Sequence, residues 1–277
     1  MVGCVSAGRG RAGGLVLRLD AGSRGSVGHL FSSPTVNTVE RPDMAGPVGP
    51  AREGRPLDVY QAVTSRRAVR AFTGEPVPRA VLDRVLSTAA HAPSGANLQP
   101  WRSYVLTSAP LAELKKRTAE RVAAGDPGDA REYEMYPPRL KSPYRERRFA
   151  AVQQRYAALG ISRADRRARS RAVAANWDCF GASTALFCYV DRDMGPAQWA
   201  DVGMYLQTVM LLLRAEGLHS CPQMAWSVYR RTVADVISPP DDLILFCGMS
   251  IGFEDTSTPR PRIERAPLAE TVMFLDG

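Results

Sequence analysis

Three arginines lie close together where the chain first becomes regular. Arg66, Arg67 and Arg70 fall within five residues. Guanidinium groups form paired hydrogen bonds with phosphate oxygens, and their charge persists at every physiological pH. Cations at the end of a helix also interact favourably with the helix dipole. The cluster therefore indicates either a phosphate-binding site or an ordinary charged helix end.

A second segment, residues 93–101, carries polar groups in a pattern suited to binding. Its sequence is P-S-G-A-N-L-Q-P-W, in which Ser94, Asn97 and Gln99 bear hydroxyl or amide groups. The prolines and the glycine interrupt helical structure, so the segment predicts a loop. Such a loop can exchange hydrogen bonds with a polar, planar ligand. A plain turn that leads into a strand is the alternative interpretation.

The remaining reactive side chains argue against metal and disulfide chemistry. The three histidines stand far apart and match no zinc-binding pattern. The five cysteines are odd in number and include no C-x-x-C pair, which is typical of free thiols in a reducing compartment. We expect no metal site and a cytoplasmic protein. Nothing local supports a Cys–His nucleophile pair.

Positive charge is concentrated in one part of the chain. The 277 residues carry a formal net charge of +8, and residues 112–171 hold 16 lysines and arginines against 8 acidic residues. Such a segment attracts phosphate-bearing or other anionic partners, or it forms a solvated helical face. No nucleic-acid-binding module accompanies it. No run of about 18 apolar residues predicts a membrane-spanning helix. We expect neither nucleic acid nor membrane as a partner.

The start of the chain differs from the rest in composition. Residues 1–55 are rich in glycine, serine, proline and arginine, which predicts a disordered N-terminal extension. Residues 8–13 match G-x-G-x-x-G, but the pattern lacks the flanking strand and helix that a dinucleotide-binding loop requires. The arginine-rich start is similar to a transit peptide. We favour the alternative to a transit peptide, in which translation begins at Met44 and the start of the sequence is assigned too early.

Hydrophobic spacing predicts one domain over residues 56–277. Helical periodicity predicts a helix that begins near Ser108 and helices at 57–66, 78–90, 196–216 and 230–237. Apolar runs predict a short extended segment at 219–224 and strands at 103–107, 184–190, 243–251 and 271–275. Residues 125–170, rich in proline, tyrosine and arginine, predict a lid-like insertion with one or two helices. The irregular alternation favours an α+β layered domain over a doubly wound sheet.

In its motifs the chain resembles the nitroreductase family. The opening of that family is similar to the order seen here: the pattern R-R-x-x-R, then an amphipathic helix, then A-P-S-G-x-N-x-Q-P-W, then a strand. Further similar segments follow in the family's order: Phe180-Gly181-Ala182, Asp201–Gln207 leading to Gly217-Leu218, Ser220–Ala225 and Arg260-Pro261-Arg262. The resemblance covers residues 57–277 and rests on the order of the motifs rather than on any one of them.

The resemblance implies a fold, a cofactor and a reaction. The fold would be a central, mostly antiparallel sheet flanked by helices, in an intertwined homodimer with two FMN sites. The chemistry would occur at N5 of FMN, with no catalytic side chain. A ping-pong cycle would oxidise NADPH or NADH and reduce a nitroaromatic or quinone-like compound. A cation beside N1 and O2 of the ring would favour the reduced cofactor.

The same resemblance implies which residues bind FMN. Arg66 would contact the phosphate and Arg70 the N1/O2 edge of the ring, with Arg67 and Ala68 beside them. Ala68 stands where the family often has serine, which puts one hydrogen bond to the cofactor in doubt. The second subunit would contribute a loop with Pro93, Ser94, Gly95, Asn97 and Gln99. A segment against the ring would consist of Pro222, Gln223, Met224 and Ala225. Arg260 and Arg262 would form a second phosphate-binding group. Met224-Ala225 replaces the Glu-Gly of many members, which bears on substrate preference.

The insertion 125–170 would then cover the substrate and the nicotinamide. Tyr133, Tyr136 and Tyr144 are candidates to stack on a planar ligand. The arginines of the insertion are candidates to contact the phosphates of the nicotinamide dinucleotide and to favour NADPH. A merely solvated, helical insertion is the alternative interpretation.

Other functions stay open at this level. The P-S-G-A start also resembles flavin-dependent reductive dehalogenases related to iodotyrosine deiodinase. Glu132 and Tyr136 are spaced like the lid acid and tyrosine of that group, but the matching lysine is not in its place. The flavin-consuming enzyme that makes the lower base of cobalamin has a loop that resembles this one less closely. The basic segment alone would suit a non-catalytic basic binding protein.

Overall fold

The computed structural model of this chain describes residues 57–259 and 262–275. The predicted extension 1–55, with its G-x-G-x-x-G match, lies outside the described residues. In the described part, no helix combines the length and the apolar character needed to cross a membrane. The architecture of this part is α+β, as the sequence predicts.

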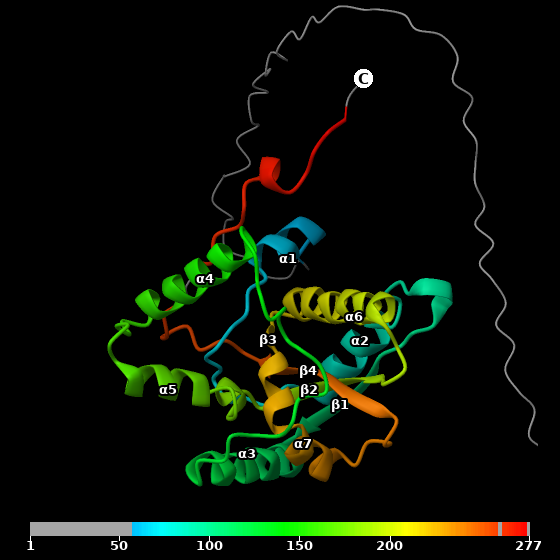
Figure 1. Ribbon diagram of the computed structural model, residues 1–277. Helices are drawn as coiled ribbons and strands as arrows, with labels where there is room; N and C mark the ends of the chain where they lie inside the picture. Colours follow the sequence, from blue (N-terminus) through cyan, green and yellow to red (C-terminus); the bar gives the residue numbers. More distant parts are fainter. Residues whose placement is uncertain (1–56, 260–261, 276–277) are drawn as a thin grey trace, which may run out of the picture. The chain divides into compact units, whose positions relative to one another are not determined.

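A four-stranded sheet lies at the centre of the described residues (Figure 1). Its strands, in chain order, are β1 (Arg102–Thr107), β2 (Thr184–Asp191), β3 (His219–Gln223) and β4 (Leu243–Gly252). Across the sheet the order is β1-β2-β4-β3, and every neighbouring pair is antiparallel. Because β3 is an edge strand, it can accept a further segment on its open side. Ala68 forms an isolated parallel bridge with Ser220 there.

Both faces of the sheet are buried, and β2 shows how its sequence achieves this. Its side chains alternate between two hydrophobic clusters, with Leu186, Cys188 and Val190 in one and Ala185, Phe187 and Tyr189 in the other. Successive side chains of a strand point to opposite faces of a sheet. An unbroken apolar run therefore fits a strand that is covered on both sides.

Helices supply the cover on each face. On the face of Leu186 lie α2 (Arg79–Ala89) and α6 (Pro196–Ala215). On the face of Phe187 lie α3 (Ser108–Ala123) and α7 (Arg230–Ile237). The short α1 (Val59–Ser65) begins at Asp58, whose carboxylate accepts a hydrogen bond from the backbone N–H of Gln61 at 2.8 Å. This capping box starts the helix that precedes the arginine cluster.

The predicted lid-like insertion contains two helices. They are α4 (Tyr144–Ala158) and α5 (Arg166–Ala174), and neither has a fully buried residue. In Figure 1 they lie beside the sheet and not across either of its covered faces. Their exposed apolar side chains include Phe149 and Val173. Both helices are therefore peripheral to the two main clusters.

Apart from their ends, the predicted helices and strands match those of the structure, with one exception. Residues 271–275 form no strand; they follow a short 3-10 helix, η4 (Leu268–Glu270). Phe274 and Leu275 expose 73% and 88% of their surface. A strand needs a neighbour to satisfy its backbone hydrogen bonds, and within the described chain no strand lies next to this segment. The apolar alternation of the tail therefore led to a wrong prediction.

Candidate functional site

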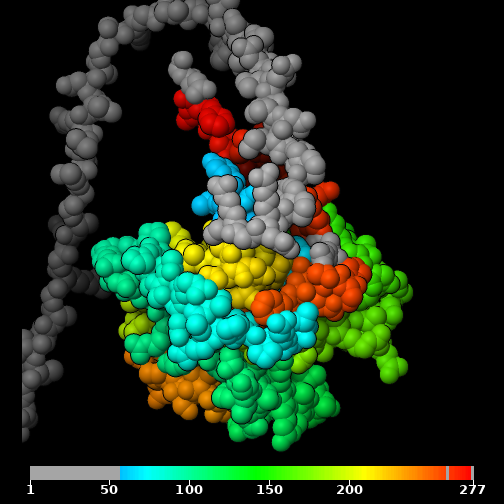
Figure 2. All heavy atoms as spheres, turned by 180° about the vertical axis from the view of Figure 1, so that it is seen from behind, coloured from blue at the N-terminus to red at the C-terminus, as the bar shows by residue number. Residues whose placement is uncertain are grey.

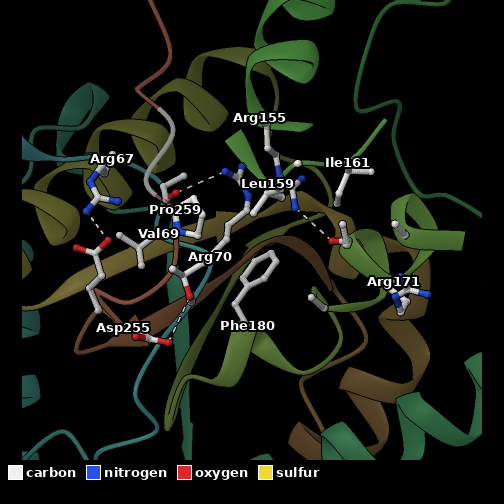
Figure 3. Close-up of a pocket in the computed structure, with 18 residues that line it drawn as sticks. Arg67, Val69, Arg70, Arg155, Leu159, Ile161, Arg171, Phe180, Asp255 and Pro259 are labelled. Atoms are coloured by element: carbon white, nitrogen blue, oxygen red, sulfur yellow. Dashed lines mark hydrogen bonds and ion pairs between the residues drawn. The ribbon is translucent and has the colours of Figure 1, made fainter. Parts of the chain in front are cut away.

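A cavity of about 540 Å³ lies between the segment after α1, the helices α4 and α5, and the segment after β4 (Figure 3). The segments after α1 and β4 are joined by the backbone N–H of Asp255, which donates to the carbonyl oxygen of Ala71 at 3.0 Å. In Figure 2 these segments, cyan and orange-red, meet on the back of the molecule. The helices of the insertion thus close a cavity against the arginine cluster that the sequence singles out.

Backbone hydrogen bonds fix the floor of this cavity. The N–H of Val69 donates to the carbonyl oxygen of Ser220 on β3 at 3.1 Å. Three residues on, the N–H of Phe72 donates to the carbonyl oxygen of Phe180 at 3.1 Å. Val69 and Phe72 are buried, so their side chains anchor the segment in the core. The segment is thereby held at the open side of β3, where Ala68 and Arg70 line the cavity.

Arginines give the cavity a positive charge. Arg70 is exposed, and its Nη1 donates to the carbonyl oxygen of Ala68 at 3.4 Å. Arg155 of α4 donates from Nη2 to the carbonyl oxygen of Ala172 on α5 at 3.2 Å. Burial lowers the pKa of Arg155, and the neighbouring Arg70 lowers it further. Both guanidinium groups therefore keep hydrogen-bonding capacity for an anion.

Arg67 differs from Arg70 and Arg155 in having an acidic partner. Its Nη2 forms an ion pair with Glu254, which follows β4. Glu254 also lies 3.6 Å from the Nδ1 of His219. The charge of Arg67 is thus balanced inside the protein. The resemblance implies that Arg67 lies beside the cofactor; in the structure Arg67 lines the cavity and forms this ion pair.

Small and apolar side chains form the walls. They come from the segment after α1, from the end of α4, from α5 and from the 3-10 helix η2 (Cys179–Gly181): Ala68, Leu159, Ile161, Ala172, Ala175 and Phe180. Ligand sites in proteins commonly combine such walls with a few polar groups that fix orientation. The arrangement can hold a flat aromatic group beside negative charge. This is the chemistry of a flavin ring and of an aromatic substrate.

The residues predicted to contact a phosphate do not line the described part of the cavity. Arg66, which ends α1, is partly buried. Burial lowers its pKa, and the positive charge of Arg265 lowers it further. Two guanidinium groups close together form a suitable position for phosphate oxygens. Arg262 is exposed, and Arg260 lies outside the described residues.

The segment predicted to face the ring lies at the end of β3. Pro222 and Gln223 belong to the strand, whereas Met224 and Ala225 begin the 3-10 helix η3 (Met224–Tyr229). The buried amide of Gln223 donates to the carbonyl oxygen of Asn176 at 2.9 Å. Its Oε1 accepts from the Ser250 hydroxyl at 2.5 Å. The side chain of Gln223 therefore positions this segment, while Met224 is exposed.

Within its own chain, the loop at residues 93–99 contacts α6. The backbone N–H of Gly95 donates to Oδ2 of Asp201 at 3.2 Å, and that of Gln99 donates to the Ser94 hydroxyl at 3.0 Å. Within the loop lies the 3-10 helix η1 (Gly95–Asn97). Pro93 and Asn97 are exposed. Among the described residues, the lining of the cavity includes none from this loop.

The three tyrosines predicted to cover a substrate lie outside the cavity lining. The hydroxyl of Tyr133 donates to the carbonyl oxygen of Phe246 at 2.6 Å, and its ring packs edge-on against Trp199. Tyr136 is exposed beneath the guanidinium of Arg148, and Tyr144 is exposed as well. From residues 125–170, the cavity lining includes Arg155, Leu159, Gly160, Ile161 and Ala168.

Sequence reasoning did not single out the lid residues that reach the cavity. Arg155 belongs to the basic segment 112–171, and this was its only signal. Leu159 follows it by four residues, which puts both side chains on one face of α4. The hydrophobic spacing of a peripheral helix does not say which of its faces meets a ligand.

Comparisons with known proteins agree with the motifs. The model of the Nitroreductase family matches residues 63–253. A 4-nitrobenzoate reductase of Pseudomonas putida is 35% identical over 198 residues, which span 72% of this chain and 86% of that protein. The crystal structure of the FMN and NADPH-dependent nitroreductase NfnB from Sphigopyxis sp. strain HMH is 43% identical with a TM-score of 0.77. That match covers 80% of this chain and 100% of the NfnB chain.

A second NfnB structure, from Mycobacterium smegmatis in complex with NADPH, is 30% identical with a TM-score of 0.73, covering 79% of this chain and 100% of its own. An iodotyrosine deiodinase of Haliscomenobacter hydrossis is 34% identical over only 89 residues, which are 32% of this chain and 36% of that protein. The deiodinases are thus distant relatives. With matched motifs, a matched family model and relatives aligned over most of their length, this chain belongs to the nitroreductase family.

Proposed function

We propose that this protein is an FMN-dependent NAD(P)H oxidoreductase that reduces nitroaromatic compounds. The observation that carries the proposal is the cavity itself, in which Arg70 and Arg155 stand over small apolar walls. Relatives that align over most of their length are named for reduction of nitrobenzoate and nitrobenzene. A quinone-like compound is the alternative electron acceptor of the same site.

The donor set fits FMN. Arg66 and Arg265 together offer two cations to the phosphate, and Arg262 is a further candidate. Arg70 offers a cation to the ring edge, and Ala68 leaves room for the ring to approach the backbone. When bound, FMN supplies hydride transfer between the nicotinamide and the nitro group in a ping-pong cycle.

The residues of this chain then have separate tasks. Arg70 stabilises negative charge at the N1/O2 edge of the ring. The apolar walls that include Phe180 and Ala175 exclude water, which strengthens that electrostatic interaction. Gln223 holds the segment Pro222–Ala225 through its bonds to Asn176 and Ser250.

The complete site requires a second copy of the chain. The loop that includes Pro93, Ser94, Asn97 and Gln99 is displayed on the surface and presents hydrogen-bonding groups there. On α1, Val59 and Tyr60 expose 72% and 78% of their surface. Exposed apolar side chains of this kind are typical of a homodimer interface. In the proposed homodimer this loop of one subunit completes the FMN site of the other.

NADPH is the proposed reductant, because the solved relatives are named for NADPH dependence or contain it. NADH is the alternative. The four described cysteines are all free and buried, which suits the proposed cytoplasmic location. No nucleic-acid or membrane partner is part of the proposal.

Purification tests the proposal directly. We expect a yellow, dimeric protein whose released flavin is FMN, and whose NADPH oxidation in the absence of oxygen depends on an added nitroaromatic. Parallel assays with NADH, a quinone and a halotyrosine separate the alternatives. A colourless protein that takes up no FMN would refute the proposal. A yellow protein that acts on halotyrosines and not on nitroaromatics would select the dehalogenase interpretation.

A further inference from the structure

Arg155 is a partly buried cation without an acidic partner among the described residues. The ion pairs found in that part of the chain all use other cations. Its guanidinium hydrogen bond goes to the neutral carbonyl oxygen of Ala172. Burial and the charge of Arg70 both disfavour its protonated form and lower its pKa. A cation in such surroundings loses hydration without gaining a counter-charge, so binding of an anion is favourable.

The surroundings of Arg155 suit an anion attached to an aromatic ring. Leu159 lies one helical turn further along, at the end of α4, and Ile161 follows that helix; both line the cavity. Figure 3 shows Arg155 and Leu159 together at the lid side of the cavity, with the ring of Phe180 below them. An inorganic ion would gain nothing from these apolar surfaces, whereas an aromatic acid would bury its ring against them.

We propose that Arg155 binds the carboxylate of the substrate, so that the protein favours nitroaromatic acids over neutral nitroaromatics. This inference rests on the proposed function, and it deepens it by naming the substrate class. In the proposed function Arg66 and Arg265 contact the phosphate of FMN and Arg70 contacts its ring edge. Two further arginines of the lining, Arg155 and Arg171, form no ion pair among the described residues, and of these Arg171 is exposed whereas Arg155 is partly buried. We therefore assign the substrate to Arg155. A carboxylate can take two parallel hydrogen bonds from one guanidinium group.

The test compares two acceptors that differ in charge but hardly in shape, the acid 4-nitrobenzoate and its amide, 4-nitrobenzamide. In the holoenzyme, Arg155→Gln should raise the KM for the acid by about tenfold or more, the effect of losing a charged hydrogen bond. The KM for the amide and the kcat values for both acceptors should stay within about twofold of wild type. The contact between Arg155 and the carboxylate is equally strong in the ground state and the transition state, so its loss changes binding and not kcat. Arg155→Lys should recover part of the loss.

Two further measurements make the result independent of turnover. Calorimetry with benzoate and benzamide reports binding of the charged and neutral ligands to wild-type and Arg155→Gln protein, whether or not either is reduced. Arg167→Gln is the matched control, since it removes the same charge from an exposed position of α5 that does not line the cavity. The control should leave all values unchanged.

Distinct outcomes would overturn the inference. Equal losses with the acid and the amide, together with a lower flavin midpoint potential, would assign Arg155 to the cofactor. A raised KM for NADPH alone would assign it to the nucleotide. Wild-type protein that binds benzoate no better than benzamide would also refute it. By contrast, a protein that binds benzoate through Arg155 but reduces no nitroaromatic would refute the proposed function and leave only the carboxylate-binding role of Arg155.

Discussion

Substitution of Gly248 by alanine should destabilise the protein through one sharp steric conflict. Gly248 lies on β4, opposite Gln223 of β3. A Cβ atom built there would lie 2.4 Å from Cδ1 of Trp226 and 3.2 Å from Cε1 of Phe187. Both rings are fully buried. Neither ring can swing into solvent, so relief requires a shift of η3, which carries Trp226.

The magnitude follows from the cost of overpacking. Inserting a methyl group into a packed core costs about 1–3 kcal/mol, and the contact with Trp226 places Gly248→Ala at the upper end of that range. For a domain of this size, about 3 kcal/mol corresponds to a fall in Tm of about 6–12 °C. Because η3 begins with Met224-Ala225, the same shift should weaken FMN binding.

Urea unfolding at fixed protein concentration measures the effect on the free energy of unfolding, and fluorescence titration with FMN measures the effect on the site. Gly203→Ala is the matched control: it lies on α6, and a Cβ built there meets nothing within 4 Å. The control should be more stable than wild type by about 0.5–1 kcal/mol, the helix preference of alanine over glycine. A free energy of unfolding for Gly248→Ala within about 0.5 kcal/mol of wild type would refute the packing argument.

Three further predictions concern the site. Arg66→Ala should raise the dissociation constant of FMN about tenfold through loss of a charged phosphate contact, measured by fluorescence titration; unchanged retention would count against the assignment. Gln223→Leu should lower the free energy of unfolding by about 2 kcal/mol in urea, because it leaves the Ser250 hydroxyl and the Asn176 carbonyl without their partner; a neutral effect would contradict the network. Burial raises the pKa of Cys221 despite the opposing charges of Arg70 and Arg155, so at about pH 8 the thiol should stay protonated. Mass spectrometry should find it alkylated by iodoacetamide only after unfolding, and rapid alkylation of the folded protein would disprove its burial.

The basic segment at residues 112–171 includes one arginine, Arg155, that lines the cavity. The surplus of positive charge over residues 112–171 is compatible with a solvated helical face, and Arg145 and Arg148 of α4 are exposed. Arg155 lies on the same helix but turns toward the cavity. One helix thus combines a solvated face with a ligand-facing one, and the charge count alone does not separate them.

Local sequence determined the elements that position the site. The apolar run of β2 fits a strand covered on both faces, and the spacing of Leu206, Val209 and Leu213 fits a buried face of α6. Both are properties of short segments, because strand and helix periodicities repeat within a few residues. The family motifs, read in order, also carried the fold and the cofactor hypothesis.

Only the tertiary structure decided which side chains share the cavity. It placed Arg67 in an ion pair with Glu254, which is 187 residues further along the chain, and it packed Tyr133 against Trp199. It also left the tail at 271–275 without a neighbouring strand among the described residues. Pairing of this kind depends on contacts between distant segments, and hydrophobic spacing encodes which face of an element is buried but not against what. The arginines near the start of the fold were visible in the sequence; the partners they meet, and the lid arginine that joins them, were not.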